Sequence, residues 1–149
     1  MSDLFEYVHT EGNDPAFNMP YTPGITVTGG QIMYLAGVTA APVYHSHPHV
    51  ASEFDDIPLD PEEQTEMCLN NLRDVLEAAG GDLGSIVEVT RYMVDQAKNQ
   101  DGVNRAMGRA FGDHRPASTS VEVVRLATDP RLILELKAVA VVPVDESGA

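Results

Sequence analysis

Residues 60–94 read DPEEQTEMCLNNLRDVLEAAGGDLGSIVEVTRYMV, a segment that predicts a helix followed by a strand. Asp60 is suited to an N-cap, Pro61 to the first helical position, and the two glutamates that follow place acid in the first turn. Apolar residues then recur at helical spacing at Leu69, Leu72, Leu76 and Ala79. Gly80 and Gly81 predict the end of this helix, because glycine accepts the backbone conformations that close one.

The strand part of this segment is SIVEVTRYMV, residues 85–94, which is rich in β-branched and apolar side chains. Successive side chains of a strand point to opposite faces of the sheet. Apolar residues fall on both phases of this alternation, with Ile86, Tyr92 and Val94 on one phase and Val87, Val89 and Met93 on the other. We therefore expect a mostly buried strand.

A second helix and two further strands are predicted downstream. The helix fits residues 99–112, where the apolar positions at helical spacing are Val103, Ala106, Met107, Ala110 and Phe111. The strands fit residues 119–126 and 132–142, and the second of these is so apolar that we expect it at the centre of the sheet.

Upstream of residue 60 the sequence predicts a hairpin and then a long loop. Residues 25–38, ITVTGGQIMYLAGV, contain two strand-forming runs around Gly29 and Gly30, and glycine adopts the positive φ of a tight turn at little cost. Residues 40–59 carry three prolines and three histidines without apolar periodicity, which indicates an exposed loop.

The three histidines of this loop, His45, His47 and His49, alternate, so an extended segment would place their imidazoles on one side. Imidazole nitrogens are ligands for zinc and other borderline metals. The residues that would have to approach as a fourth ligand are Asp55, Asp56 and His114. We interpret the segment as an exposed polar loop rather than a metal site, and we expect it to line or cover a cleft.

The predicted elements follow one another as hairpin, helix, strand, helix, strand and strand, with each helix long enough to cross the same face of one sheet. This order predicts an α+β fold, a two-layer sandwich of one mixed sheet with two helices on one face. The second face of the sheet is then uncovered although the strands carry apolar residues on both phases. Self-association is the expected way to bury it.

Length and composition fit a single domain over residues 1–149, with a core at about 5–143. The 23 acidic and 9 basic residues give a formal charge of −14, which opposes the phosphate neutralisation that nucleic-acid binding requires. No apolar stretch approaches the roughly 20 residues of a membrane span, and the acidic start is unlike a signal peptide. We therefore expect a cytoplasmic protein without nucleic-acid or membrane partners, and a packed, inert thiol at Cys68, the single cysteine.

Several motifs between about Tyr21 and Pro143 occur together in one known family. They are Pro20-Tyr21, Ala36-Gly37, EEQTEMCLNNLRDVLEAAGGDL, SIVEVTRYMVD, Val103-Asn104, RPASTSVEVVRL and LELKAVAV. On these motifs the chain resembles the RidA/YjgF family over nearly its whole length. The resemblance implies a chorismate-mutase-like sandwich, a homotrimer with clefts between subunits, and a small carboxylate substrate, with no metal or organic cofactor. It also implies hydrolysis of amino-acid-derived enamines or imines, with release of ammonia.

Four residues match functional positions of that family: Tyr21, Gly37, Asn104 and Glu135. The resemblance implies that the first three bind substrate, with the Gly37 backbone meeting the ligand. It further implies that Glu135 is catalytic, orienting water and moving protons.

Two serines stand where the family has other residues. Ser118 occupies the position of the arginine that clamps the substrate carboxylate, and Ser120 the position of a cysteine; both are therefore expected to line the substrate site. A serine offers one donor and no charge, so it does not reproduce a bidentate guanidinium contact. Another cation is then needed, and the candidates are Arg91, Arg115 and Arg131.

Lys137 lies two positions after Glu135 on the predicted last strand, so both side chains face the same way. A lysine at this position resembles the pattern in the branch of the family that contains 2-aminomuconate deaminases. It either pairs with Glu135 or receives an anionic substrate.

Three functions are consistent with these residues. The first is a divergent deaminase of an enamine or imine intermediate in amino-acid or aromatic-compound metabolism. The second is a trimer that binds a small metabolite without turning it over. A ribonuclease or translation inhibitor ranks last because of the charge of −14.

Overall fold

The computed structural model describes residues 3–148 and contains an α+β arrangement of strands and helices. In chain order these are β1 (Phe5–Val8), β2 (Gly24–Val27), β3 (Gln31–Tyr34), α1 (Pro61–Glu77), β4 (Ile86–Val94), α2 (Gln96–Phe111), β5 (Ala117–Val123) and β6 (Leu134–Val142). Short 3₁₀ helices occur at η1 (Ala51–Phe54), η2 (Leu83–Ser85) and η3 (Glu146–Gly148). The domain limits predicted at 1–149 include residues 1, 2 and 149, which lie outside the described residues.

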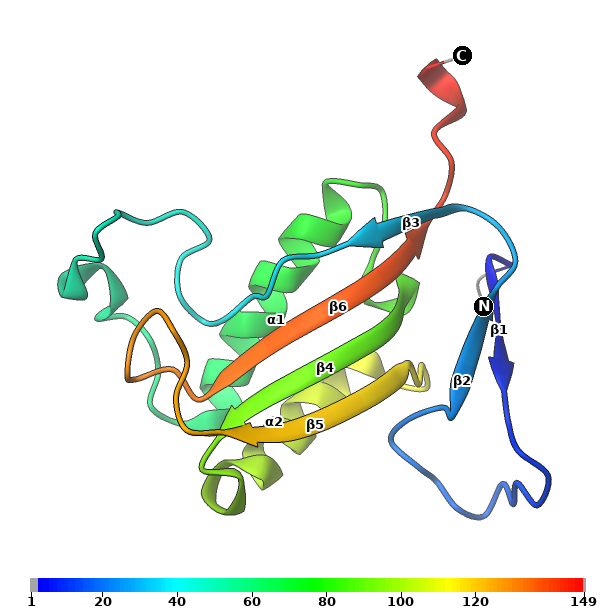
Figure 1. Ribbon diagram of the computed structural model, residues 1–149, viewed down its shortest axis with the longest axis horizontal. Helices are drawn as coiled ribbons and strands as arrows, with labels where there is room; N and C mark the ends of the chain where they lie inside the picture. The colour runs from blue at the N-terminus through cyan, green and yellow to red at the C-terminus, as the bar shows by residue number, and fades with distance from the viewer. Residues whose placement is uncertain (1–2, 149) are drawn as a thin grey trace.

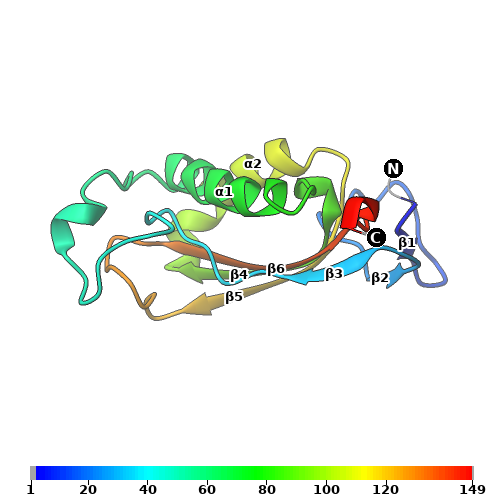
Figure 2. The ribbon, with the colours of Figure 1, turned by 90° about the horizontal axis from the view of Figure 1, so that it is seen from above.

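The main sheet has the strand order β3-β6-β4-β5 (Figure 1). β5 runs parallel to β4, whereas β6 is antiparallel to both of its neighbours, β3 and β4. Helices α1 and α2 lie side by side against one face of this sheet, and Figure 2 shows that they leave most of the other face without a helix. The predicted two-layer sandwich is confirmed, as is the central place of the last strand.

The predicted hairpin is wrong, because β2 and β3 do not pair with each other. β2 pairs antiparallel with β1, which the sequence did not predict, and β3 pairs with β6. The glycines between β2 and β3 carry the chain from one sheet to the other. Gly30 has a φ of 76°, and a Cβ there would lie 2.7 Å from the Val142 carbonyl oxygen, so the glycine is needed for this crossing rather than for a two-residue turn.

Some predicted element limits also shift in the structure. α2 begins at Gln96, earlier than the predicted residue 99, and β5 ends at Val123, before the predicted residue 126. Val124 is 94% exposed, and Leu126 is buried from a loop position rather than from a strand. The apolar residues after Val123 led to a predicted strand that is too long, because the chain leaves the sheet at that point.

The core between the layers is built from the apolar stripe of α1 and the helix-facing side chains of the central strands. Leu69, Leu72 and Leu76 are fully buried against Leu136 and Ala140 of β6. Asp60 caps the helix as predicted, since its carboxylate accepts hydrogen bonds from the backbone N–H groups of the first helical turn at 3.0 Å. No helix within residues 3–148 combines the length and the apolar character that crossing a bilayer requires.

Cys68 belongs to this core and is expected to be unreactive in the native protein. Its thiol is fully buried and donates a hydrogen bond to the Val38 carbonyl oxygen at 3.3 Å, and burial raises the pKa of Cys68 to about 12. The thiolate is the reactive form, so iodoacetamide should not label the folded protein at neutral pH but should label it fully in urea. Mass spectrometry measures this directly, and rapid labelling without denaturant would contradict the expectation.

Candidate functional site

A hollow of about 500 Å³ lies at the β5 edge of the sheet, beside α2 and on the helix-facing side. Four of the predicted substrate-binding residues line it: Tyr21, Asn104, Ser118 and Ser120. They come from the segment before β2, from α2 and from β5. The volume falls within the range of small-molecule sites, about 300–1,000 Å³.

Arg91 of β4 lies in this hollow and contacts two of those residues. Its Nε donates to Ser120 Oγ at 2.7 Å, and its Nη1 donates to Asn104 Oδ1 at 2.8 Å. Burial lowers the pKa of Arg91, but a guanidinium remains charged at neutral pH. Within residues 3–148, no carboxylate lies within ion-pair distance of Arg91. A partly buried cation with only neutral partners favours an anionic ligand.

Arg115 also lines the hollow, and its Nε and Nη1 both donate to backbone carbonyl oxygens. Its Nε donates to the Met19 carbonyl oxygen at 3.2 Å, and Nη1 donates to the Gly112 carbonyl oxygen. The Thr22 hydroxyl in turn donates to the Arg115 carbonyl oxygen at 2.5 Å. These bonds hold the segment that carries Tyr21 beside α2, so Arg115 positions the wall of the hollow.

His114 at the back of the hollow has both ring nitrogens occupied. Nε2 donates to the Ile86 carbonyl oxygen at 2.6 Å, so in the neutral ring Nδ1 accepts from the Tyr7 hydroxyl at 2.7 Å. Burial lowers the pKa of His114, which favours this neutral form. Its ring is thus part of the wall rather than a free base or a metal ligand.

Glu135 and Lys137 lie on the opposite face of the sheet. Arg91 pairs with Leu136 on one side and with Ser120 on the other, and Leu136 is buried under the helices. The side chains that flank Leu136 therefore point to the face opposite α1 and α2, as the predicted alternation requires. The ion pairs of the described chain do not include one between Glu135 and Lys137.

A second, shallower hollow surrounds Glu135 on that face. Gly37, Arg125 and Lys137 also line it. Val38 pairs with Leu136 through two backbone hydrogen bonds of 2.9 Å, which sets Gly37 against the Glu135 side chain. A Cβ at this glycine would overlap the Glu135 carboxylate. Any residue larger than glycine at position 37 would therefore displace the Glu135 carboxylate from this position.

One chain therefore holds the predicted site in two halves. The half with Arg91, Ser118 and Ser120 faces the helices, and the half with Glu135 and Gly37 faces away from them. A ligand bound in one hollow of a single chain does not reach the other through the sheet. No residue of the histidine loop, 40–59, lines either hollow.

Arg131, the third candidate for the missing clamp, has a structural role. Its guanidinium donates to Asp129 Oδ1 at 2.8 Å and to Asp55 Oδ1 at 2.9 Å, and hydrogen bonds to these carboxylates raise the pKa of Arg131. The structure thus favours Arg91 among the candidates. The sequence could have indicated Arg91, because this charged residue lies on the same face of its strand as the buried Val89 and Met93.

Comparisons with known proteins agree with this architecture. The family model described as Endoribonuclease L-PSP matches residues 11–142. A RutC family protein from Pyrococcus horikoshii is 30% identical over 145 residues, which cover 91% of this chain and 96% of the relative. A 2-iminobutanoate/2-iminopropanoate deaminase from Escherichia coli is 30% identical over 132 residues, covering 87% of this chain and 92% of the relative.

Solved structures match over nearly the whole chain as well. A Rid family protein, YyfB from Yersinia pestis, superposes with a TM-score of 0.73 at 21% identity, covering 93% of this chain and 99% of the other. Escherichia coli TdcF with bound serine superposes with a TM-score of 0.61 at 25% identity, covering 91% and 98%.

Proposed function

The chain belongs to the RidA/YjgF family, which the family model Endoribonuclease L-PSP describes, and we propose that it binds a small carboxylate metabolite and hydrolyses an enamine or imine. The observation that carries the proposal is Arg91, a partly buried cation beside Tyr21, Asn104 and Ser118 with no carboxylate partner in the described chain. Two relatives support a small-molecule ligand, since one is named an iminobutanoate/iminopropanoate deaminase and another holds serine.

In the proposed reaction, Arg91 replaces the arginine that the family has at the position of Ser118. Its guanidinium holds the substrate carboxylate, while the hydroxyls of Ser118 and Ser120 supply neutral donors. The Glu135 carboxylate takes a proton from water as the water oxygen adds to the imine carbon, and it passes this proton to the imine nitrogen. It then moves the hydroxyl proton of the resulting carbinolamine to the amino group, and the carbon–nitrogen bond breaks as the carbonyl forms. Ammonia leaves and a 2-oxo acid remains.

The proposal places each site between two copies of the chain, in a homotrimer. The two halves lie on opposite faces of one sheet, so a neighbouring copy has to supply Glu135 to the hollow that contains Arg91. The face with Glu135 also exposes apolar side chains, among them Tyr34 at 77% and Ile32 at 54%. Covering this face with further copies removes apolar surface from water.

The experiment that tests the proposed function measures ammonia release from freshly generated 2-aminoacrylate and from 2-aminomuconate. The natural protein and the Ser118→Arg variant are compared under the same conditions. Activity of the natural protein supports deamination without an arginine at position 118. Activity of the Ser118→Arg variant alone would overturn it, because the natural ligand would then differ from the family's substrates.

Binding without turnover is the second candidate, favoured by the loss of the arginine at position 118. A ligand that raises the melting temperature and is recovered unchanged would establish it.

A further inference from the structure

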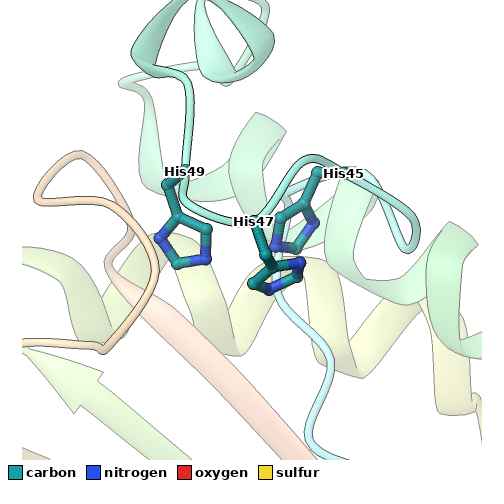
Figure 3. A group of neighbouring side chains, drawn as sticks. All are labelled: His45, His47 and His49. Carbon is teal, nitrogen blue, oxygen red and sulfur yellow. The ribbon is translucent and has the colours of Figure 1, made fainter.

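Three imidazoles converge in the loop between β3 and α1, and none of them lines either hollow. Figure 3 shows the rings of His45, His47 and His49 gathered on the same side of this loop. One ring nitrogen from each histidine contributes to a set whose members all lie within 4.8 Å of one another. We propose that this cluster binds a divalent cation of the zinc class, with an open coordination position.

The spacing of the rings suits tetrahedral zinc. The ring centroids are 4.8 Å apart for His45 and His47, 5.1 Å for His45 and His49, and 4.9 Å for His47 and His49. With Zn–N bonds of about 2.0–2.1 Å and tetrahedral angles, the centroids of ligating imidazoles lie about 5 Å apart. His47 and His49 are exposed and His45 is half-buried, so rotation of the two exposed rings is the adjustment that would bring the nitrogens to one ion.

The orientation of His45 is set by its surroundings. Its Nδ1 donates to the Pro42 carbonyl oxygen at 2.8 Å, which leaves Nε2 without a proton and free to bind a metal. A hydrogen bond from the second ring nitrogen to a carbonyl is the usual support of a metal-bound histidine. His45 and His49 also pack edge-on against Phe54, with centroids 5.3 and 5.8 Å away.

The loop that carries the cluster is anchored to the body of the protein. Phe54 is 1% exposed and packs with Leu126 and Leu132 in a small core of its own. Arg131 donates to the Ala51 carbonyl oxygen at 2.9 Å. The Glu53 carboxylate accepts from the backbone N–H and the hydroxyl of the serine between the first two histidines, both at 3.0 Å. Such anchoring reduces the ordering cost of binding an ion.

The chemistry of the donors selects the ion. Imidazole nitrogens suit Zn²⁺, Co²⁺, Ni²⁺ and Cu²⁺, whereas Mg²⁺ prefers oxygen ligands. None of the three fourth ligands considered from sequence, Asp55, Asp56 and His114, belongs to the described cluster. Asp55 bonds to Arg131, and His114 has both nitrogens occupied in the wall of the first hollow. Three histidines with an open position are the donor set of catalytic rather than structural zinc sites.

The test titrates the full-length, chelator-treated protein with Zn²⁺ by calorimetry and with Co²⁺ by visible absorption. We expect one ion per chain, the absorption of tetrahedral Co²⁺, and no binding of Mg²⁺. The His47→Ala variant should bind Zn²⁺ at least about 100-fold more weakly, since even the loss of a supporting residue around a metal site costs 10- to 100-fold. The matched control is His9→Ala, an exposed histidine outside the cluster.

The outcomes separate the proposed site from adventitious binding to an acidic protein. Unchanged Zn²⁺ affinity in His47→Ala, or an equal loss in His9→Ala, would refute the site. His49→Ala provides a second removal of one ligand in case the first variant changes the loop, and circular dichroism checks the fold of each protein. These readouts do not involve deamination, so the metal site and the proposed function are tested independently.

Discussion

Ammonia release by the Glu135→Gln variant should fall by about 10²- to 10⁴-fold, the range typical of losing a general acid–base group. Glutamine keeps the size of the side chain and its place against Gly37, but its amide does not accept the proton of the attacking water. Substrate binding should change little, because the proposed carboxylate clamp lies in the other half of the site. A fall in kcat at nearly constant KM is the expected signature.

Glu77→Gln is the control for this experiment, because Glu77 is an exposed carboxylate at the end of α1 and lines neither hollow. It should retain full activity. Equal turnover by Glu135→Gln and the natural protein would remove Glu135 from the mechanism and leave the scaffold as a binding protein.

Replacing Arg91 with methionine should weaken the binding of small carboxylates by about 10- to 150-fold. A hydrogen bond to a charged group contributes about 1.5–3 kcal/mol, and 1.4 kcal/mol corresponds to a factor of ten in affinity. Methionine preserves the apolar stem that packs in the hollow but has no charge. Calorimetry with 2-oxobutanoate, the product of 2-iminobutanoate hydrolysis, measures the change without requiring turnover.

Arg73→Met provides the comparison for that measurement. Arg73 lies on α1, where its Nη1 donates to Asn70 Oδ1 at 2.8 Å, and it lines neither hollow. Its loss should leave 2-oxobutanoate binding unchanged. Unaltered binding by Arg91→Met together with a loss in Arg125→Met would move the clamp to the face that carries Glu135.

Mixing the two inactive variants tests the proposed sharing of the site. Each variant keeps one intact half, so a cleft between a Glu135→Gln copy and an Arg91→Met copy can combine both intact halves. Random reassembly of equal amounts should restore about a quarter of the natural activity, since each cleft takes each half from a different copy. No recovery after reassembly would argue that each chain uses its own residues.

The fold was largely predictable because its longest elements carry consistent local signals. α1 has a capping aspartate, a first-turn proline and a regular apolar stripe, and β6 is apolar at every position except Glu135 and Lys137. β1 has four residues and depends on its pairing with β2, so it carries no comparable signal. The glycine pair after β2 is equally compatible with a hairpin and with a crossing between sheets, and only the partner strands decide between them.

An irregular register of β4 places Ile86 on a different face from the one predicted. Strict alternation placed Ile86 on the same face as Tyr92 and Val94. In the structure the pairing shifts between Ile86 and Glu88, and Ile86 lies in the main core with Val89 and Met93. An irregularity of this kind moves side chains to the other face without leaving a mark in apolar periodicity.

The sequence predicted part of the grouping of the candidate residues but not the arrangement of the groups. The four predicted residues around Arg91 do meet in one hollow, and Glu135 and Lys137 do share a face. The separation of these groups by the sheet depends on the register between β4, β5 and β6, which sequence alone does not supply. The selection of Arg91 over Arg115 and Arg131 likewise required their hydrogen-bond partners.

Because Arg91 and Glu135 lie on opposite faces of the sheet, the proposed site makes the reaction rate per molecule depend on the concentration of the protein. Under the proposed assembly a lone chain is inert, and the rate per molecule depends on how many copies have met. At dilutions that dissociate the complex, specific activity should therefore drop more steeply than the protein concentration itself. In a cell with little of this protein, the total reaction rate would fall by much more than the amount of protein does.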